Sequence, residues 1–103
     1  MMFMNLDTDL LRSFLAIVDT GNFTRAAERV GRTQSAVSMQ MKRLEETLGK
    51  PLLLRDKRKV RLTPDGETLV GFAQRMIDLN DAALSRLTEP ELTGQVRLGI
   101  PDD

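Results

Sequence analysis

The stretch NFTRAAERVGRTQSAVSMQMKRLEETLG, residues 22–49, predicts two helices joined by a tight turn. The first covers about residues 25–30, and Gly31 can adopt the left-handed conformation that ends a helix. The second follows Thr33, a good helix-capping residue, and runs to about Leu48. Two adjacent alanines in the first helix let the helices cross closely, so the stretch is a candidate helix-turn-helix.

The second of these helices has one apolar side and one polar side. Its apolar stripe consists of Val37, Met41, Leu44 and Leu48, which face the same way at about 100° per residue. In a DNA-binding helix-turn-helix, the polar side enters the major groove, where short side chains reach the base edges. The alternative is an ordinary helical hairpin with a solvated polar face.

Side-chain chemistry suggests what each residue on the polar side could contact. Gln34 can pair with adenine through both the oxygen and the nitrogen of its side-chain amide, and Met39 can touch a thymine methyl. Ser35 and Ser38 can bind bases or phosphates, while Lys42 is placed for phosphate or guanine.

Two short runs of β-forming residues follow, at 52–55 and 60–62. They flank the residues DKRK, so they predict a β-hairpin with a basic tip. Such a tip can contact DNA, with Arg58 in the minor groove and Arg55 and Lys59 on phosphates. The alternative is a charged turn that protects the edge of a sheet.

A further helix is predicted before the helix-turn-helix, at about residues 9–18, with Asp7 or Thr8 as its cap. The cap of the helix after it is Asn22 or Thr24. The inward side of the helix at 9–18 is predicted to be Leu10, Leu11, Phe14, Leu15 and Val18, with Arg12, Ser13 and Ala16 on the other side.

The residues TPDG at 63–66 have the capping residue, proline and acid that are typical of a helix start. They predict a long helix that runs to about Leu87, before Pro90. Leu69 and Phe72 are expected to pack on the first helix. The later apolar positions have no visible partner within the chain, which favours a second copy. The predicted dimerisation residues are Phe72, Met76, Leu79, Ala83 and Leu87.

Composition excludes several classes of site. The 103 residues include no cysteine and no histidine, so zinc fingers, disulfides and histidine-based catalysis are impossible within them. The net charge is zero, but residues 21–62 carry eleven basic and four acidic side chains between two acidic flanks. A basic middle third favours a surface that faces a polyanion, although uneven solvated charge is the simpler alternative.

The sequence resembles a known family at several motifs, namely residues 22–30, 33–45, 48–49, 52–55 and 60–66. Together they resemble the N-terminal domain of LysR-type transcriptional regulators, and the similarity covers residues 6–88. The resemblance implies a mostly α fold: a winged helix-turn-helix, with three helices plus a two-stranded β-wing, followed by a long linker helix that dimerises.

Carried over by position, the resemblance implies base or phosphate contacts at Thr33, Gln34, Ser35, Ser38, Met39 and Arg58. Two residues depart from the family pattern. Met39 stands where arginine is frequent, which removes a charged contact. Leu53 stands where phenylalanine is usual, which requires only a repacked core.

The resemblance also predicts how the chain is organised. Residues 1–62 form the DNA-binding domain, 63–88 the linker and dimerisation helix, and 89–103 a hinge and the first strand of a truncated effector-binding domain. The expected partners are double-stranded DNA with an inverted-repeat site, and a second copy of the chain. A full-length protein is expected to form a tetramer and to bind a small-molecule inducer through the missing C-terminal domain. We expect a cytoplasmic protein with no cofactor, metal or membrane contact.

Two other functions are possible from the residues alone. A winged-helix module could bind protein through the apolar stripe of the long helix, which would leave the basic hairpin without a role. An enzyme would need a catalytic constellation, but the acids of this chain form no pair in a predicted cleft, and no glycine-rich phosphate loop is present. We therefore expect no enzymatic activity.

Overall fold

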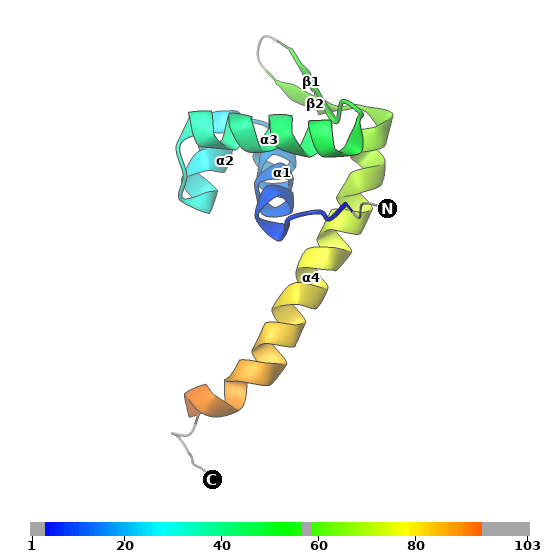
Figure 1. Cartoon of the computed structure of the whole chain (residues 1–103). Coiled ribbons are helices and arrows are strands. Elements are labelled where there is room, and N and C mark those ends of the chain that lie inside the picture. The colour runs from blue at the N-terminus through cyan, green and yellow to red at the C-terminus, as the bar shows by residue number, and fades with distance from the viewer. Residues whose placement is uncertain (1–3, 57–58, 94–103) are drawn as a thin grey trace.

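The computed structural model describes residues 4–56 and 59–93. The elements are α1 (Thr8–Thr20), α2 (Phe23–Val30), α3 (Gln34–Leu48), β1 (Leu53–Arg55), β2 (Val60–Leu62) and α4 (Pro64–Thr93) (Figure 1). The first three helices and the hairpin form a globular head, and α4 extends away from it as a long arm. This is the predicted winged helix-turn-helix with a long helix after it. The strand expected after the hinge, which residues 96–100 would form, lies outside the described residues, and so does Arg58.

Each helix of the head begins at a side-chain cap and ends at a glycine. Asp7 caps α1, Asn22 caps α2 and Thr33 caps α3, and each side chain accepts a hydrogen bond from a backbone N–H in the first turn. The glycines that follow the three helices have φ values of 70°, 72° and 69°. Only glycine adopts this left-handed conformation without strain, so local chemistry sets these helix ends.

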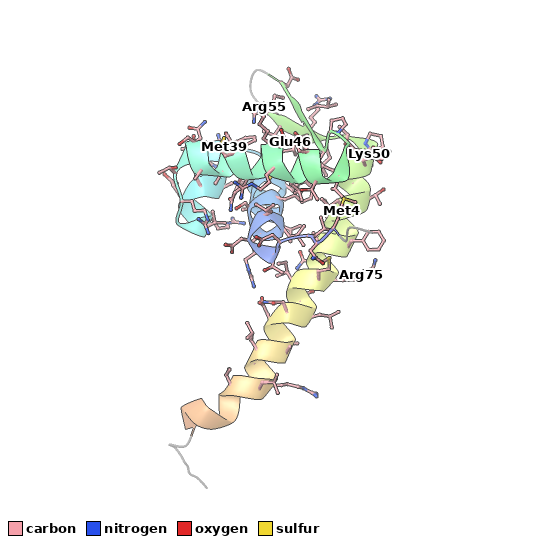
Figure 2. All side chains as sticks on the ribbon, viewed as in Figure 1. Met4, Met39, Glu46, Lys50, Arg55 and Arg75 are labelled. Carbon is pink, nitrogen blue, oxygen red and sulfur yellow. The ribbon has the colours of Figure 1, made fainter. Side chains whose placement is uncertain are left out.

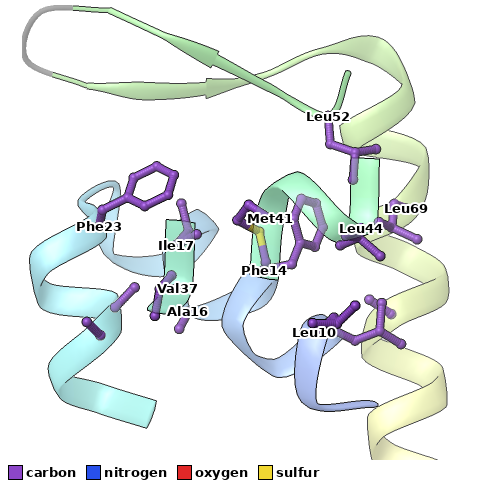
Figure 3. Close-up of a cluster of buried hydrophobic side chains, with 14 of the residues drawn as sticks. Leu10, Phe14, Ala16, Ile17, Phe23, Val37, Met41, Leu44, Leu52 and Leu69 are labelled. Carbon is purple, nitrogen blue, oxygen red and sulfur yellow. The ribbon is translucent and has the colours of Figure 1, made fainter. Parts of the chain in front are cut away.

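The core is built around α1, which packs against α2, α3, α4 and β2 (Figure 3). Leu11, Phe14 and Ile17 are fully buried. The prediction that Ser13 and Ala16 lie on an outer side is wrong, because their relative exposures are only 1% and 4%. A central helix is covered on more than one side, and small residues let the neighbouring helices approach. The Ser13 hydroxyl donates to Gln40 Oε1 of α3 at 2.5 Å, which satisfies the buried group.

The junction between the hairpin and α4 is centred on Thr63, which is 7% exposed. Its hydroxyl donates to the Pro51 carbonyl at 2.7 Å and accepts from the Gly66 N–H at 2.9 Å. Its own N–H donates to the Leu52 carbonyl at 3.0 Å. Thr63 therefore caps α4 and ties its start to the residues before β1. The two strands pair antiparallel, with Leu53 opposite Leu62.

The arm α4 is longer than predicted, since it continues past Leu87 to Thr93. Residues 89–93, which were expected to begin the hinge, therefore continue the helix. Pro90 lies in the last turn of this 30-residue helix. Because proline has no backbone N–H, the helix lacks one of its hydrogen bonds there. No helix in residues 4–56 and 59–93 has the length and apolar character that a membrane crossing needs.

An ion pair links the arm to α1, beside the apolar contacts that pack the two helices together. Arg12 and Asp81 approach to 2.5 Å, and this hydrogen bond, supported by one from Asn80, lowers the pKa of Asp81 below its ordinary value. A lowered carboxyl pKa in the folded state adds stability at pH values above the unfolded pKa. That stability is lost as the pH falls through the folded value. Both side chains are largely exposed, so the contribution is small.

Gly66 gives a direct test of the junction. A Cβ at this position would lie 2.2 Å from the Leu52 carbonyl oxygen, which is backbone and cannot move aside alone. We expect Gly66→Ala to lower the free energy of unfolding by about 1–3 kcal/mol or more, measured by urea or thermal denaturation. Gly71→Ala is the matched control. Gly71 lies on the same helix, and a Cβ added there would have no neighbouring atom within 4 Å. That variant should be neutral or slightly more stable, and equal behaviour of the two variants would contradict the proposed packing.

Candidate nucleic-acid interface

The outer face of α3 carries the residues predicted to read DNA. Gln34, Ser35, Met39 and Lys42 are exposed and Ser38 is partly buried, while the apolar stripe on the opposite side is in the core. Met39 is 61% exposed, so its thioether side chain is available to a partner at this face. Figure 2 shows Met39 and Arg55 on the side of α3 that carries the hairpin. The predicted orientation of this helix is confirmed.

A groove of about 720 Å³ lies between α3 and the hairpin. It is lined by Gln34, Ser35, Ser38, Met39, Lys42, Glu45 and Arg55. Six of these seven residues are predicted contacts, and the fold brings them together across residues 34–55. Thr33 and Lys59 do not line the groove: Thr33 lies at the start of α3 as its cap, and Lys59 lies just before β2.

Arg55 crosses from the hairpin to α2. Its guanidinium carbon lies 4.4 Å from the centre of the Phe23 ring, a cation–π contact. Phe23 is itself buried at 9% exposure, so the ring is a fixed platform. The contact holds a positive charge at the edge of the groove.

Glu45 is a residue of this region that sequence reasoning missed. Its Oε2 accepts hydrogen bonds from the backbone N–H groups of Leu52 (2.8 Å) and Leu53 (3.2 Å). These bonds fix the base of the hairpin to the last turns of α3. The available signal was an acid at the edge of the apolar stripe, shortly before a proline that ends helical structure.

The arm α4 carries a second surface, which is apolar. Leu79 and Leu87 are 71% and 77% exposed, and Ala83 between them is also exposed. Met76 differs from the prediction, because it is partly buried against the core. Phe72 was expected to pack on α1, but it is 52% exposed. The guanidinium carbon of Arg75 lies 4.9 Å from the centre of its ring, a cation–π contact.

The helical period explains the difference at Phe72. Leu69, Ala73 and Ile77 are four residues apart and face the head, where all three are buried. Phe72 and Leu79 are turned away from that line by the rotation of about 100° per residue. An apolar groove of about 340 Å³ lies beside Phe72 and Met76, with Leu48 and Leu52 among its other lining residues.

Comparison with known proteins decides the family. Residues 8–67 match the model of the bacterial regulatory helix-turn-helix proteins of the lysR family. The chain belongs to the LysR family. This family consists of transcription regulators rather than enzymes, as the sequence predicts.

Several LysR relatives are similar over nearly all of the chain. The regulator DgdR of Burkholderia cepacia is 50% identical over 99 residues, which are 96% of this chain and 34% of the relative. The regulator PecT of Dickeya dadantii is 44% identical over 100 residues, which are 97% of this chain and 32% of the relative. The chain thus spans about a third of the length of these curated LysR relatives.

Solved LysR structures share the fold. A complex of the CbnR DNA-binding domain with DNA is 31% identical, with a TM-score of 0.76 over 82% of this chain and 97% of that one. A complex of the BenM DNA-binding domain with benA site 1 DNA is 33% identical, also with a TM-score of 0.76, over 82% of this chain and 94% of that one.

Charge on this LysR domain is more polarised than its sequence suggests. Arg29 and Arg32 belong to the basic middle third, but they pair with Asp19 and Asp9 of α1. These pairs neutralise the side of the head formed by α1 and α2. Lys42 and Arg55, in contrast, lie in the groove.

The role of Glu45 can be tested by truncation. Glu45→Ala removes the acceptor of two backbone N–H groups at the base of the hairpin. We expect a loss of about 1–3 kcal/mol in the free energy of unfolding, because partly buried donors are left unpaired. The neighbouring Glu46 is exposed, so Glu46→Ala should change stability by less than about 0.5 kcal/mol. A Glu45→Ala variant as stable as Glu46→Ala would show that these bonds do not hold the hairpin.

Proposed function

We propose that this chain is the part of a LysR-type regulator that binds a specific sequence of double-stranded DNA. The observation that carries the proposal is the groove between α3 and the hairpin, which gathers Gln34, Ser38, Met39, Lys42 and Arg55. Amide, hydroxyl, thioether and cationic groups on one exposed helix face match what base edges and phosphates offer. The DNA complexes of the CbnR and BenM domains support the same use of a shared fold.

Each group has a role in this proposal. Helix α3 lies in the major groove, where Gln34 reads adenine and Met39 touches a thymine methyl, with Ser35 and Ser38 on bases or phosphates. Lys42 contacts phosphate or guanine. The helix start at Thr33 and the hairpin residues Arg55 and Lys59 contact phosphates. Arg58, which lies outside the described residues, is assigned to the minor groove from the basic hairpin tip and from the sequence resemblance.

We further propose that two copies associate through α4. The unpartnered positions Leu79, Ala83 and Leu87 extend the line of Phe72 and Met76 along one side of the arm. A twofold protein matches an inverted-repeat site, because each half-site then meets an identical head. Where such a domain continues into an effector-binding domain, that second domain would bind a small-molecule inducer, and the dimers would pair into a tetramer.

Salt dependence tests the DNA proposal. Binding that releases counterions weakens as salt rises, so log affinity should fall steeply with log salt concentration. Where Lys42 contacts phosphate, Lys42→Ala should weaken binding to all sequences and reduce the magnitude of that slope by about 1 for each bound copy. Arg29→Ala removes the same charge from the opposite side of the head, where it pairs with Asp19, and should leave the slope unchanged. A wild-type slope near zero in a fluorescence-anisotropy titration would contradict the proposal.

Sedimentation tests the dimer. The wild-type chain should sediment as a dimer at micromolar concentration, and the double variant Leu79→Glu/Leu87→Glu as a monomer, because charges would have to be desolvated in an apolar contact. Ser85→Glu is the control, since it adds a charge to an exposed position on another side of the arm. A wild-type monomer, or a double variant that remains dimeric, would rule out this surface as the interface.

A further inference from the structure

Two residues in the first turn of α2 lie outside the groove and contact two of the residues that line it. The Thr24 hydroxyl donates a hydrogen bond to Gln34 Oε1 at 3.2 Å, and the Phe23 ring carries the guanidinium of Arg55 at 4.4 Å. Phe23 and Thr24 do not themselves line the groove. Asn22, rather than Thr24, accepts the capping hydrogen bond of this helix, so the Thr24 hydroxyl has no part in starting it.

The bond to Thr24 restricts what Gln34 can present to DNA. A free glutamine on a helix surface samples several rotamers, and its amide can turn so that either the oxygen or the nitrogen leads. With Oε1 held toward α2, the Nε2 donors point away from α2. One lone pair of Oε1 remains for a further donor. This orientation suits an adenine edge, whose N7 accepts and whose N6 donates.

We propose that Thr24 is a positioning residue that sets the base preference of Gln34 without being needed for affinity to DNA in general. The inference rests on the proposed DNA-binding function. The alternative role for Thr24 is a direct hydroxyl contact to phosphate. That contact would strengthen binding to every sequence alike, because phosphates carry no base information.

The experiment compares base preference among variants of the full chain. Duplex DNA with a randomised central segment is selected with the wild-type chain and with Gln34→Ala, and the base pair whose preference is lost in Gln34→Ala is the one that Gln34 reads. Affinities for the preferred duplex, for the duplex changed at that base pair, and for an unrelated duplex are then measured for Thr24→Val. Valine has the shape of threonine but no hydroxyl, and Thr24 is exposed, so the fold should be retained.

Thr24→Val should reduce discrimination at that base pair by about two- to tenfold, the worth of one hydrogen bond. Its affinity for the unrelated duplex should be unchanged. Thr24→Ser keeps the hydroxyl and should retain discrimination, as should Thr68→Val, which removes a hydroxyl bonded only to its own helix. In the Gln34→Ala background, Thr24→Val should have no further effect on discrimination.

Three results would overturn the inference or its basis. Equal weakening on all three duplexes would identify a phosphate contact, and unchanged discrimination in Thr24→Val would show that the bond does not matter. Both would leave the proposed function intact, provided that Gln34→Ala loses a base preference. If the wild-type chain selects no sequence from the pool, the DNA-recognition proposal itself fails.

Discussion

The backbone of Leu52 is the point at which α3, the hairpin and α4 are joined. Its N–H donates to the Glu45 carboxylate of α3, and its carbonyl accepts from the Thr63 N–H before α4. Its side chain is 1% exposed. Its carbonyl oxygen lies so close to Gly66 that a Cβ on residue 66 would clash with it. Because one peptide segment satisfies all of these contacts, the hairpin has a fixed position beside α3. The groove that the functional proposal depends on exists only because of that position.

Local chemistry made the elements of this fold predictable. Helix ends follow from caps and glycines, and the facing of α3 follows from the spacing of Val37, Met41 and Leu44. These signals lie within a few residues of the structure that they specify. The polar face of α3 was predictable for the same reason. Once the apolar stripe is known to face the core, the opposite side of the helix must face solvent. The basic residues of the hairpin predicted further contacts, of which Arg55 lies in the groove.

What could not be predicted depends on contacts between distant residues. Ser13 resembles a surface residue until Gln40, which is 27 positions away, is placed opposite it. Gly66 fits the turn-like TPDG motif, but the physical need for glycine comes from the carbonyl of Leu52. Glu45 and Thr24 act through a strand and a neighbouring helix, which no periodicity within their own segments reveals. The exposure of Phe72 depends on the rotation at which α4 leaves the head.

The ion pairs of the head explain how a neutral chain can present a positive surface. Arg12, Arg29 and Arg32 come from different parts of the head, yet each pairs with an aspartate on α1 or α4. The acids that balance the net charge are therefore concentrated around α1 and the arm. The cations of α3 and the hairpin lie on the other side, where Glu45 is turned to backbone N–H groups. Since the field near a surface depends on nearby charges more than on the total, this separation favours approach of a polyanion to the α3 face. The same pairs link α1 to the arm, to α2 and to the α2–α3 turn, but their side chains are largely exposed, so the buried apolar core stabilises the head far more than they do.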